Sequence, residues 1–96
     1  MAKISKFDAA EYLDNPVMIA AYLSEALETN DAAFIAEAIN TVARAKGMAT
    51  VAKEAGLSRE SLYKTFNGKT KPEFDTVQKV VDAFGLKLVV EPKEAA

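Results

Sequence analysis

The chain has 96 residues, of which half are apolar, and it contains no Cys and no His and carries a formal net charge of −2. This length corresponds to one domain, which can bury roughly two-thirds of its unfolded surface without a metal or a disulfide. The missing Cys and His exclude disulfide frameworks, Cys/His zinc sites, and catalysis by a Cys nucleophile or a His base. The N-terminal residues are too polar for a signal peptide and no apolar run is long enough to span a membrane. We therefore expect a cytoplasmic protein with no membrane partner, no metal and no cofactor.

Three helical segments are predicted before the middle of the chain. Residues 7–14 are typical of a short helix or turn. Asn15 can cap a second helix, in which Pro16 at the first position loses no hydrogen bond. Asp31 can cap a third helix, which ends at Gly47. Apolar residues with a helical period define the inward faces of the second and third helices, namely Met18, Ile19, Tyr22, Leu23, Ala26 and Leu27, then Phe34, Ile35, Ala38, Ile39, Val42 and Ala43.

Residues 48–68 are predicted to form two short helices hinged at Gly56, which can adopt the left-handed conformation that ends a helix. The first helix places Val51, Ala52 and Ala55 on one face. Ser58 is a good N-cap for the second helix, whose Leu62 and Phe66 can face the first. The outer face then carries Arg59, Glu60, Ser61, Tyr63 and Lys64. This pattern is typical of a helix-turn-helix, whose second helix enters the DNA major groove.

A turn and one more helix come next. Asn67 and Gly68 are typical of a turn, and residues 69–72 are predicted to form a loop. The next helix runs from Phe74 to Phe84, and Gly85 ends it. Its predicted inward residues are Phe74, Val77, Val80, Val81 and Phe84.

Residues 86–92 have a different pattern, because apolar and polar side chains alternate as in a strand until Pro92 ends it. No other segment has a strand pattern, so this one lacks an obvious partner in its own chain. The same strand of a second copy could pair with it antiparallel about a two-fold axis. We therefore predict a homodimer joined at least partly through Leu86, Leu88 and Val90.

Charge is distributed unevenly along the chain. Residues 1–43 hold two Lys and seven acidic residues, a net charge of −5. Residues 44–71 hold seven cationic and two acidic residues, a net charge of +5, and residues 72–96 have a net charge of −2. Because the Debye length is only about 8 Å at physiological salt, a partner responds to the local charge. The basic block coincides with the predicted helix-turn-helix.

The chain resembles the DNA-binding domain of lambda-repressor-like (Xre-type) regulators over GMATVAKEAGLSRESLYKTFNGKTKPEFDTVQKVVDAFGLKL. With FDAAEYLDNPVMIAAYLSEALETND added, nearly the whole chain resembles the addiction-module antidote proteins, the antitoxins of bacterial toxin–antitoxin pairs. The resemblance implies an all-α protein with a lambda-repressor-like domain. We expect one domain, with N-terminal helices over residues 1–45, the helix-turn-helix core and following helix over 46–85, and the strand over 86–92.

The family resemblance also implies partners. Such antitoxins neutralise a cognate RelE-like or killer-type toxin and repress their own operator, so double-stranded DNA and a toxin are the expected partners. The chain departs from the Xre pattern at one site. Met48 stands where Gln usually opens the first motif helix and holds a phosphate. Only backbone N–H groups of residues 48–50 remain there for that contact.

The predicted DNA contacts fall into two groups. The base-facing candidates are Arg59, Glu60, Ser61 and Lys64, and Arg59 leads because Arg paired with guanine is the commonest specific contact. The phosphate-facing candidates are Ser58, Tyr63, Asn67, Lys69, Thr70 and Lys71. Blander roles stay open: Arg59 as a solvated side chain, Ser58 as a cap, Tyr63 in packing, and the loop as an ordinary basic loop. For Glu60 we favour an i,i+4 pair with Lys64 over a cytosine contact.

Acidic residues of the N-terminal half are candidates for the toxin-facing surface, although each by itself also fits a solvated helix face; they are Glu11, Asp14, Glu25, Glu28 and Glu37. A basic ribonuclease would be attracted to such a surface. Two other classes remain, a stand-alone phage-like repressor and a helical bundle that binds only proteins. An enzyme would need carboxylates or Lys in a cleft, and no spacing suggests one.

Overall fold

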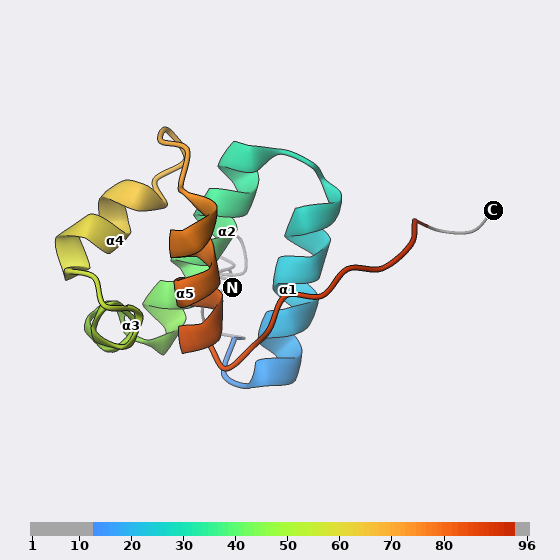
Figure 1. Ribbon diagram of the computed structural model, residues 1–96. Helices are drawn as coiled ribbons and strands as arrows, with labels where there is room; N and C mark the ends of the chain where they lie inside the picture. The colour runs from blue at the N-terminus through green and yellow to red at the C-terminus, as the bar shows by residue number, and fades with distance from the viewer. Residues whose placement is uncertain (1–12, 94–96) are drawn as a thin grey trace, which may run out of the picture.

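The computed structural model describes residues 13–93, which form five α-helices in chain order (Figure 1). They are α1 (Pro16–Glu28), α2 (Ala32–Lys46), α3 (Met48–Ala55), α4 (Arg59–Thr65) and α5 (Phe74–Ala83). The prediction of an all-α protein agrees with this arrangement. Most of the helix or turn predicted at residues 7–14 lies outside the described residues.

Three of the helices begin at the cap residues that the sequence predicts. The Oδ1 atom of Asn15 accepts a hydrogen bond of 2.9 Å from a first-turn N–H of α1. Asp31 Oδ1 accepts two such bonds at the start of α2, at 3.1 and 3.2 Å. Ser58 Oγ accepts one of 2.9 Å at the start of α4. Each cap satisfies N–H groups that have no partner within the helix.

Helices α3 and α5 end in the same way, at a glycine with a left-handed backbone. Gly56 has φ of 76° and Gly85 has φ of 83°. After α3, the N–H of Leu57 donates to the carbonyl of Ala52 at 2.8 Å, and the corresponding distance after α5 is 3.2 Å. These bonds, with a second from each glycine N–H, form a Schellman motif. In both cases the next residue is a leucine packed against the core.

One hydrophobic core joins all five helices. Its largest fully buried side chains come from every helix or its cap: Phe66, Phe84, Ile19, Leu62, Val42, Val51 and Val80. Helices α2 and α5 lie between α1 on one side and α3 with α4 on the other (Figure 1). Helices α1 and α4 are therefore at opposite ends of the molecule.

Four apolar side chains that the helical period places inward are exposed instead. Phe74 is 67% exposed, and Met18, Leu27 and Phe34 are each between 44% and 48% exposed. All four lie in the first or last turn of a helix. The ends of these helices extend past the core, so the inward stripe faces solvent there. The predictions for these four residues were therefore wrong, whereas Val80, Val81 and Phe84 are buried as predicted.

The predicted strand over residues 86–92 is not formed in the single chain. No helix or strand is assigned from residue 86 to 93. A strand is defined by hydrogen bonds to a neighbour, and no other strand exists among residues 13–93 to provide them. Residues 86–93, here named the arm, pass α1 and then leave the body of the molecule (Figure 1).

Candidate nucleic-acid interface

The turn between α3 and α4 is short, and buried side chains fix how the two helices pack. Leu62 and Phe66, four residues apart on one side of α4, are both 0% exposed. Ala52 of α3, which has a small side chain, is also buried. This packing anchors one side of α4 in the core, which leaves its opposite side in solvent.

All four predicted base-facing residues, Arg59, Glu60, Ser61 and Lys64, are exposed. The pair that we favoured between Glu60 and Lys64 is not formed. The ion pair among the described residues instead joins Lys79 to Asp75 in α5, at 3.3 Å. No ion pair therefore holds the side chains of Glu60 and Lys64 together.

The six predicted phosphate-facing residues are also exposed, but two of them have structural tasks. Ser58 is the N-cap of α4, which is the blander of its two predicted roles. Asn67 Oδ1 accepts hydrogen bonds from the N–H groups of Lys69 (2.7 Å) and Thr70 (3.2 Å). This Asx turn shapes the loop between α4 and α5. The side-chain amide nitrogen of Asn67 is not used in this turn, so it could donate a hydrogen bond to a phosphate.

The same loop contacts α2, which the sequence did not predict. Gly68 has φ of 86°, and a Cβ atom built on it would lie 2.8 Å from Oε2 of Glu37. Glu37 therefore packs against the basic loop, away from the acidic residues of α1 with which we grouped it. Only a tertiary contact reveals this, because 31 positions separate the two residues.

The start of α3 has no side-chain cap, since Gly47 precedes it. Met48 is buried, so it serves the core at the position where a phosphate-binding Gln would stand in the Xre pattern. Ala49 and Thr50 are exposed. The first N–H groups of α3 are thus the groups left at this end for an anion.

The cationic residues of the basic block all lie at the surface of the molecule. All seven of these side chains are exposed, on the end of α2, on α3, on α4 and on the loop after it. They are Arg44, Lys46, Lys53, Arg59, Lys64, Lys69 and Lys71. We name residues 44–71 the basic end.

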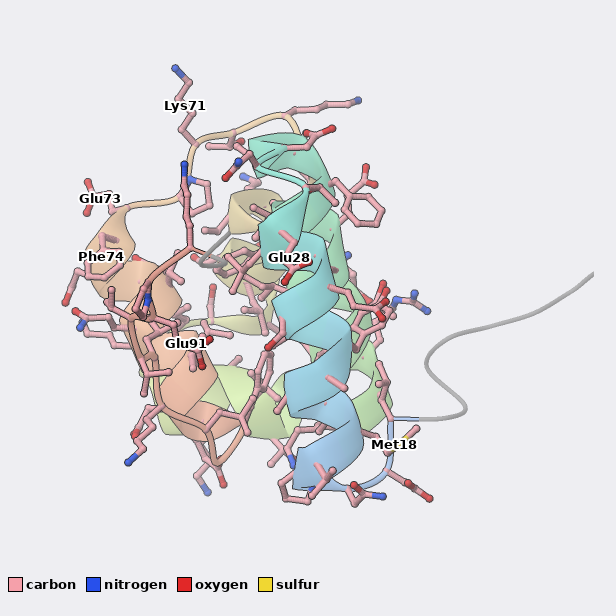
Figure 2. The ribbon with its side chains drawn as sticks, turned by 90° about the vertical axis from the view of Figure 1, so that its right-hand side faces the viewer. Met18, Glu28, Lys71, Glu73, Phe74 and Glu91 are labelled. Atoms are coloured by element: carbon pink, nitrogen blue, oxygen red, sulfur yellow. The ribbon has the colours of Figure 1, made fainter. Side chains whose placement is uncertain are left out.

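The other end of the molecule is acidic and apolar. Asp14, Glu25 and Glu28 are exposed at or on α1, which has no cationic residue. Glu11 lies outside the described residues. Glu28 and Glu91 of the arm both lie on the side of the molecule shown in Figure 2. Beside them is a cavity of about 160 Å³ between α1, α2, α5 and the arm, and its lining is mainly apolar.

Two kinds of site are not found in the part of the chain that the structure describes. None of the five helices is long and apolar enough to cross a bilayer. No three acidic side chains in residues 13–93 come together as a metal ion would require.

Comparison with known proteins gives a family. A protein of Haemophilus influenzae (strain ATCC 51907 / DSM 11121 / KW20 / Rd), described as an uncharacterized protein, is 38% identical over 94 residues, covering 98% of this chain and 97% of its own length. No solved structure matches the chain. A family model described as "Probable addiction module antidote protein" matches residues 3–92. The chain belongs to this family of addiction module antidote proteins.

Proposed function

We propose that this protein is the antitoxin of a toxin–antitoxin module, and that it represses its own operon by binding the operator through a lambda-repressor-like helix-turn-helix. The observation that carries the proposal is the basic end. There, Leu62 and Phe66 hold α4 with Arg59 and Lys64 exposed, on a chain that is otherwise net negative. A short exposed cationic helix of this kind fits the major groove.

In this proposal the exposed side of α4 reads bases. Arg59, in its first turn, would donate two hydrogen bonds to guanine O6 and N7. Ser61 and Lys64 would contact neighbouring base edges. Because Glu60 does not pair with Lys64, its carboxylate is available to accept from cytosine N4.

Contacts to the sugar–phosphate backbone would set the register of α4 on the duplex. The first N–H groups of α3 and the loop after α4 flank that helix in the chain. Tyr63, Asn67, Lys69, Thr70 and Lys71 would contribute, with Ser58 acting chiefly as the cap. Neutralising phosphates releases bound counterions, so affinity would fall as salt rises.

The toxin would bind away from the DNA. The acidic residues at α1 lie at the end of the molecule opposite α4 (Figure 1), so one protein could hold both partners. A RelE-like or killer-type ribonuclease must bind RNA and would be basic. Asp14, Glu25 and Glu28 would attract it and speed association.

The proposed active form is a homodimer. Leu88 and Val90 of the arm are exposed, and Leu86 packs on the core at the base of the arm. Pairing of two arms would provide the neighbour that each lacks. A dimer also matches the two half-sites that such proteins read on DNA.

The DNA-binding part is tested by fluorescence anisotropy with two labelled duplexes at moderate salt, the protein's own promoter and a scrambled sequence of equal composition. Wild-type protein should prefer the promoter. Arg59→Ala should reduce that preference roughly fivefold to 150-fold, since a bidentate Arg–guanine pair contributes about 1–3 kcal/mol of discrimination. Arg44→Ala is the control, because it removes the same charge from the basic end at a position outside α4. It should weaken binding to both duplexes by the same factor.

Two results would contradict this part. If Arg59→Ala lowered the affinity for both duplexes by the same factor, Arg59 would be a phosphate ligand. If wild-type protein showed no preference for the promoter, a helical bundle that binds only proteins would be favoured. The toxin-binding part is tested separately by co-expression with the products of the adjacent reading frames, among which the proposal expects a small basic protein. Failure of that protein to co-purify would leave a stand-alone repressor.

A further inference from the structure

We infer that two arms pair in one specific register, with Val89 on the two-fold axis and Lys87 opposite Glu91 of the partner subunit. The partner is a second copy of this chain, and the inference rests on the proposed homodimer. It adds which residues face each other, and it assigns two of the three charged side chains of the arm, Lys87 and Glu91, a role in choosing the register.

The arm exposes both its backbone and its apolar side chains. Beyond Leu86, whose N–H ends the Schellman motif, no backbone hydrogen bond joins the arm to the described residues. Exposure rises along it, from 42% at Leu88 to 65% at Val89 and 98% at Val90. An unpaired extended segment with apolar side chains is a template for another strand.

The base of the arm is already held in place. Leu86 packs against the core, and Leu88 and Val89 line the cavity beside α1 and α5. A segment positioned in this way loses less conformational entropy on pairing than a free tail would. The arm is therefore suited to be one half of a two-stranded ribbon.

Charge selects the register. In an antiparallel pair centred on Val89, Lys87 lies opposite Glu91 of the partner subunit, and the symmetry makes this pair twice. Leu88 then lies opposite Val90 of the partner subunit, so apolar side chains meet as well. Opposite charges and apolar pairs across two strands are both stabilising.

Neighbouring registers lose these pairs. Centred on residue 88, the pairing puts Lys87 opposite a valine. Centred on residue 90, it puts Lys87 opposite Lys93 of the partner subunit, which is repulsive. A two-fold pair cannot be centred between two residues, because directly opposed side chains point to the same face and neighbouring residues of a strand point to opposite faces.

Proline at residue 92 fits the same register. Opposed pairs in an antiparallel ribbon alternate between hydrogen-bonded and non-hydrogen-bonded types. If the pair at Val89 is hydrogen-bonded, so is the pair of Lys87 with Glu91, and residues 88, 90 and 92 occupy the other type. Pro92, which has no N–H, then leaves no ladder bond unmade.

The absence of Cys allows a direct test by disulfide trapping. In Val89→Cys, the two Cα atoms would lie about 5.5 Å apart across the axis, within disulfide range. In the control Val90→Cys, they would be offset by two residues and lie roughly 8 Å apart, too far to bridge. Under mild oxidation we expect Val89→Cys to form covalent dimers at least tenfold faster than Val90→Cys.

Charge reversal tests the pair itself, with the dimer dissociation constant measured by sedimentation equilibrium. Lys87→Glu or Glu91→Lys alone should raise it roughly fivefold to thirtyfold, because each change creates two like-charge pairs. The double variant Lys87→Glu/Glu91→Lys should restore it to within about twofold of wild type, as expected if the two charges face each other.

The outcomes separate the register from the proposed function. A wild-type dimer in which Val90→Cys is trapped as fast as Val89→Cys, or in which the double variant stays as weak as the single ones, would overturn the register and leave the dimer intact. A wild-type chain that sediments as a monomer alone, or self-associates only with its toxin, would overturn both register and homodimer. The anisotropy measurement of operator preference would still test DNA binding, independently of the register and of the homodimer.

Discussion

The two ends of this molecule use the same local device for different purposes. After α3 and after α5, a left-handed glycine precedes a leucine that packs on the core, Leu57 in one case and Leu86 in the other. At the basic end Ser58 comes next and caps a new helix. At the other end an alternating segment comes next and no helix restarts. The residues after the leucine, rather than the glycine turn, therefore decide whether the chain makes a helix or an arm.

The ends also differ in charge. Seven exposed cations lie between residues 44 and 71 with two acidic residues, whereas α1 carries acidic residues and no cation. Their separation in space (Figure 1) keeps the charge of the basic end and the charge of the acidic residues at α1 from cancelling each other. Substitutions at either end test this difference between the basic end and the rest of the molecule.

The largest effect should come from the buried base of α4. Phe66→Ala should reduce the free energy of unfolding by about 3–5 kcal/mol, because Phe66 is 0% exposed and its loss leaves a cavity. Phe74→Ala is the matched control at the start of α5. It should change stability by less than about 0.5 kcal/mol, since Phe74 is 67% exposed. Urea denaturation measures both, and similar losses would show that Phe74 is covered in solution.

A smaller and equal effect is expected at the two glycine turns. Gly56→Ala and Gly85→Ala should each destabilise the protein by about 1–2 kcal/mol, the cost of a left-handed backbone with a Cβ atom. No atom lies within 4 Å of a Cβ built at either site, so no clash adds to this cost. Thermal unfolding compares them. If only one of the two substitutions lowered the thermal stability, the two turns would not be equivalent.

The smallest effect concerns phosphate contacts in the loop after α4. Lys69→Ala/Lys71→Ala should weaken binding to promoter and scrambled duplexes alike and lower the slope of log affinity against log salt by about 0.9 per lost contact. Lys79→Ala/Lys93→Ala removes the same charge from α5 and from the end of the arm, outside both the basic end and the proposed pair of Lys87 with Glu91, and should leave that slope unchanged. Equal slopes in the two double variants would place the loop away from DNA.

Much of the fold could be predicted from short-range signals. Asn15, Asp31 and Ser58 cap the helices as predicted, because a cap depends on neighbours within three residues. The glycine at residue 56 and the buried face of α4 reflect equally local patterns. Helical period failed where helices extend past the core, at Phe34 and Phe74.

Other features depend on partners distant in the chain or outside it. The contact between Gly68 and Glu37 joins a loop to α2 and has no signature in the sequence. Residues 86–92 have the alternation of a strand, but a strand also needs a neighbour, which the described chain does not supply. The sequence thus predicted the exposed residues of α4 correctly, whereas the strand predicted over residues 86–92 is not formed in the single chain.

The most direct test of the division between the two ends is a titration of ¹⁵N-labelled protein with its promoter duplex, monitored by amide chemical shifts. We predict that the largest changes fall in residues 48–50 and 58–71, while α1 and the arm change little. Changes concentrated in α1 and the arm, with α4 unaffected, would contradict the assignment of DNA binding to the basic end.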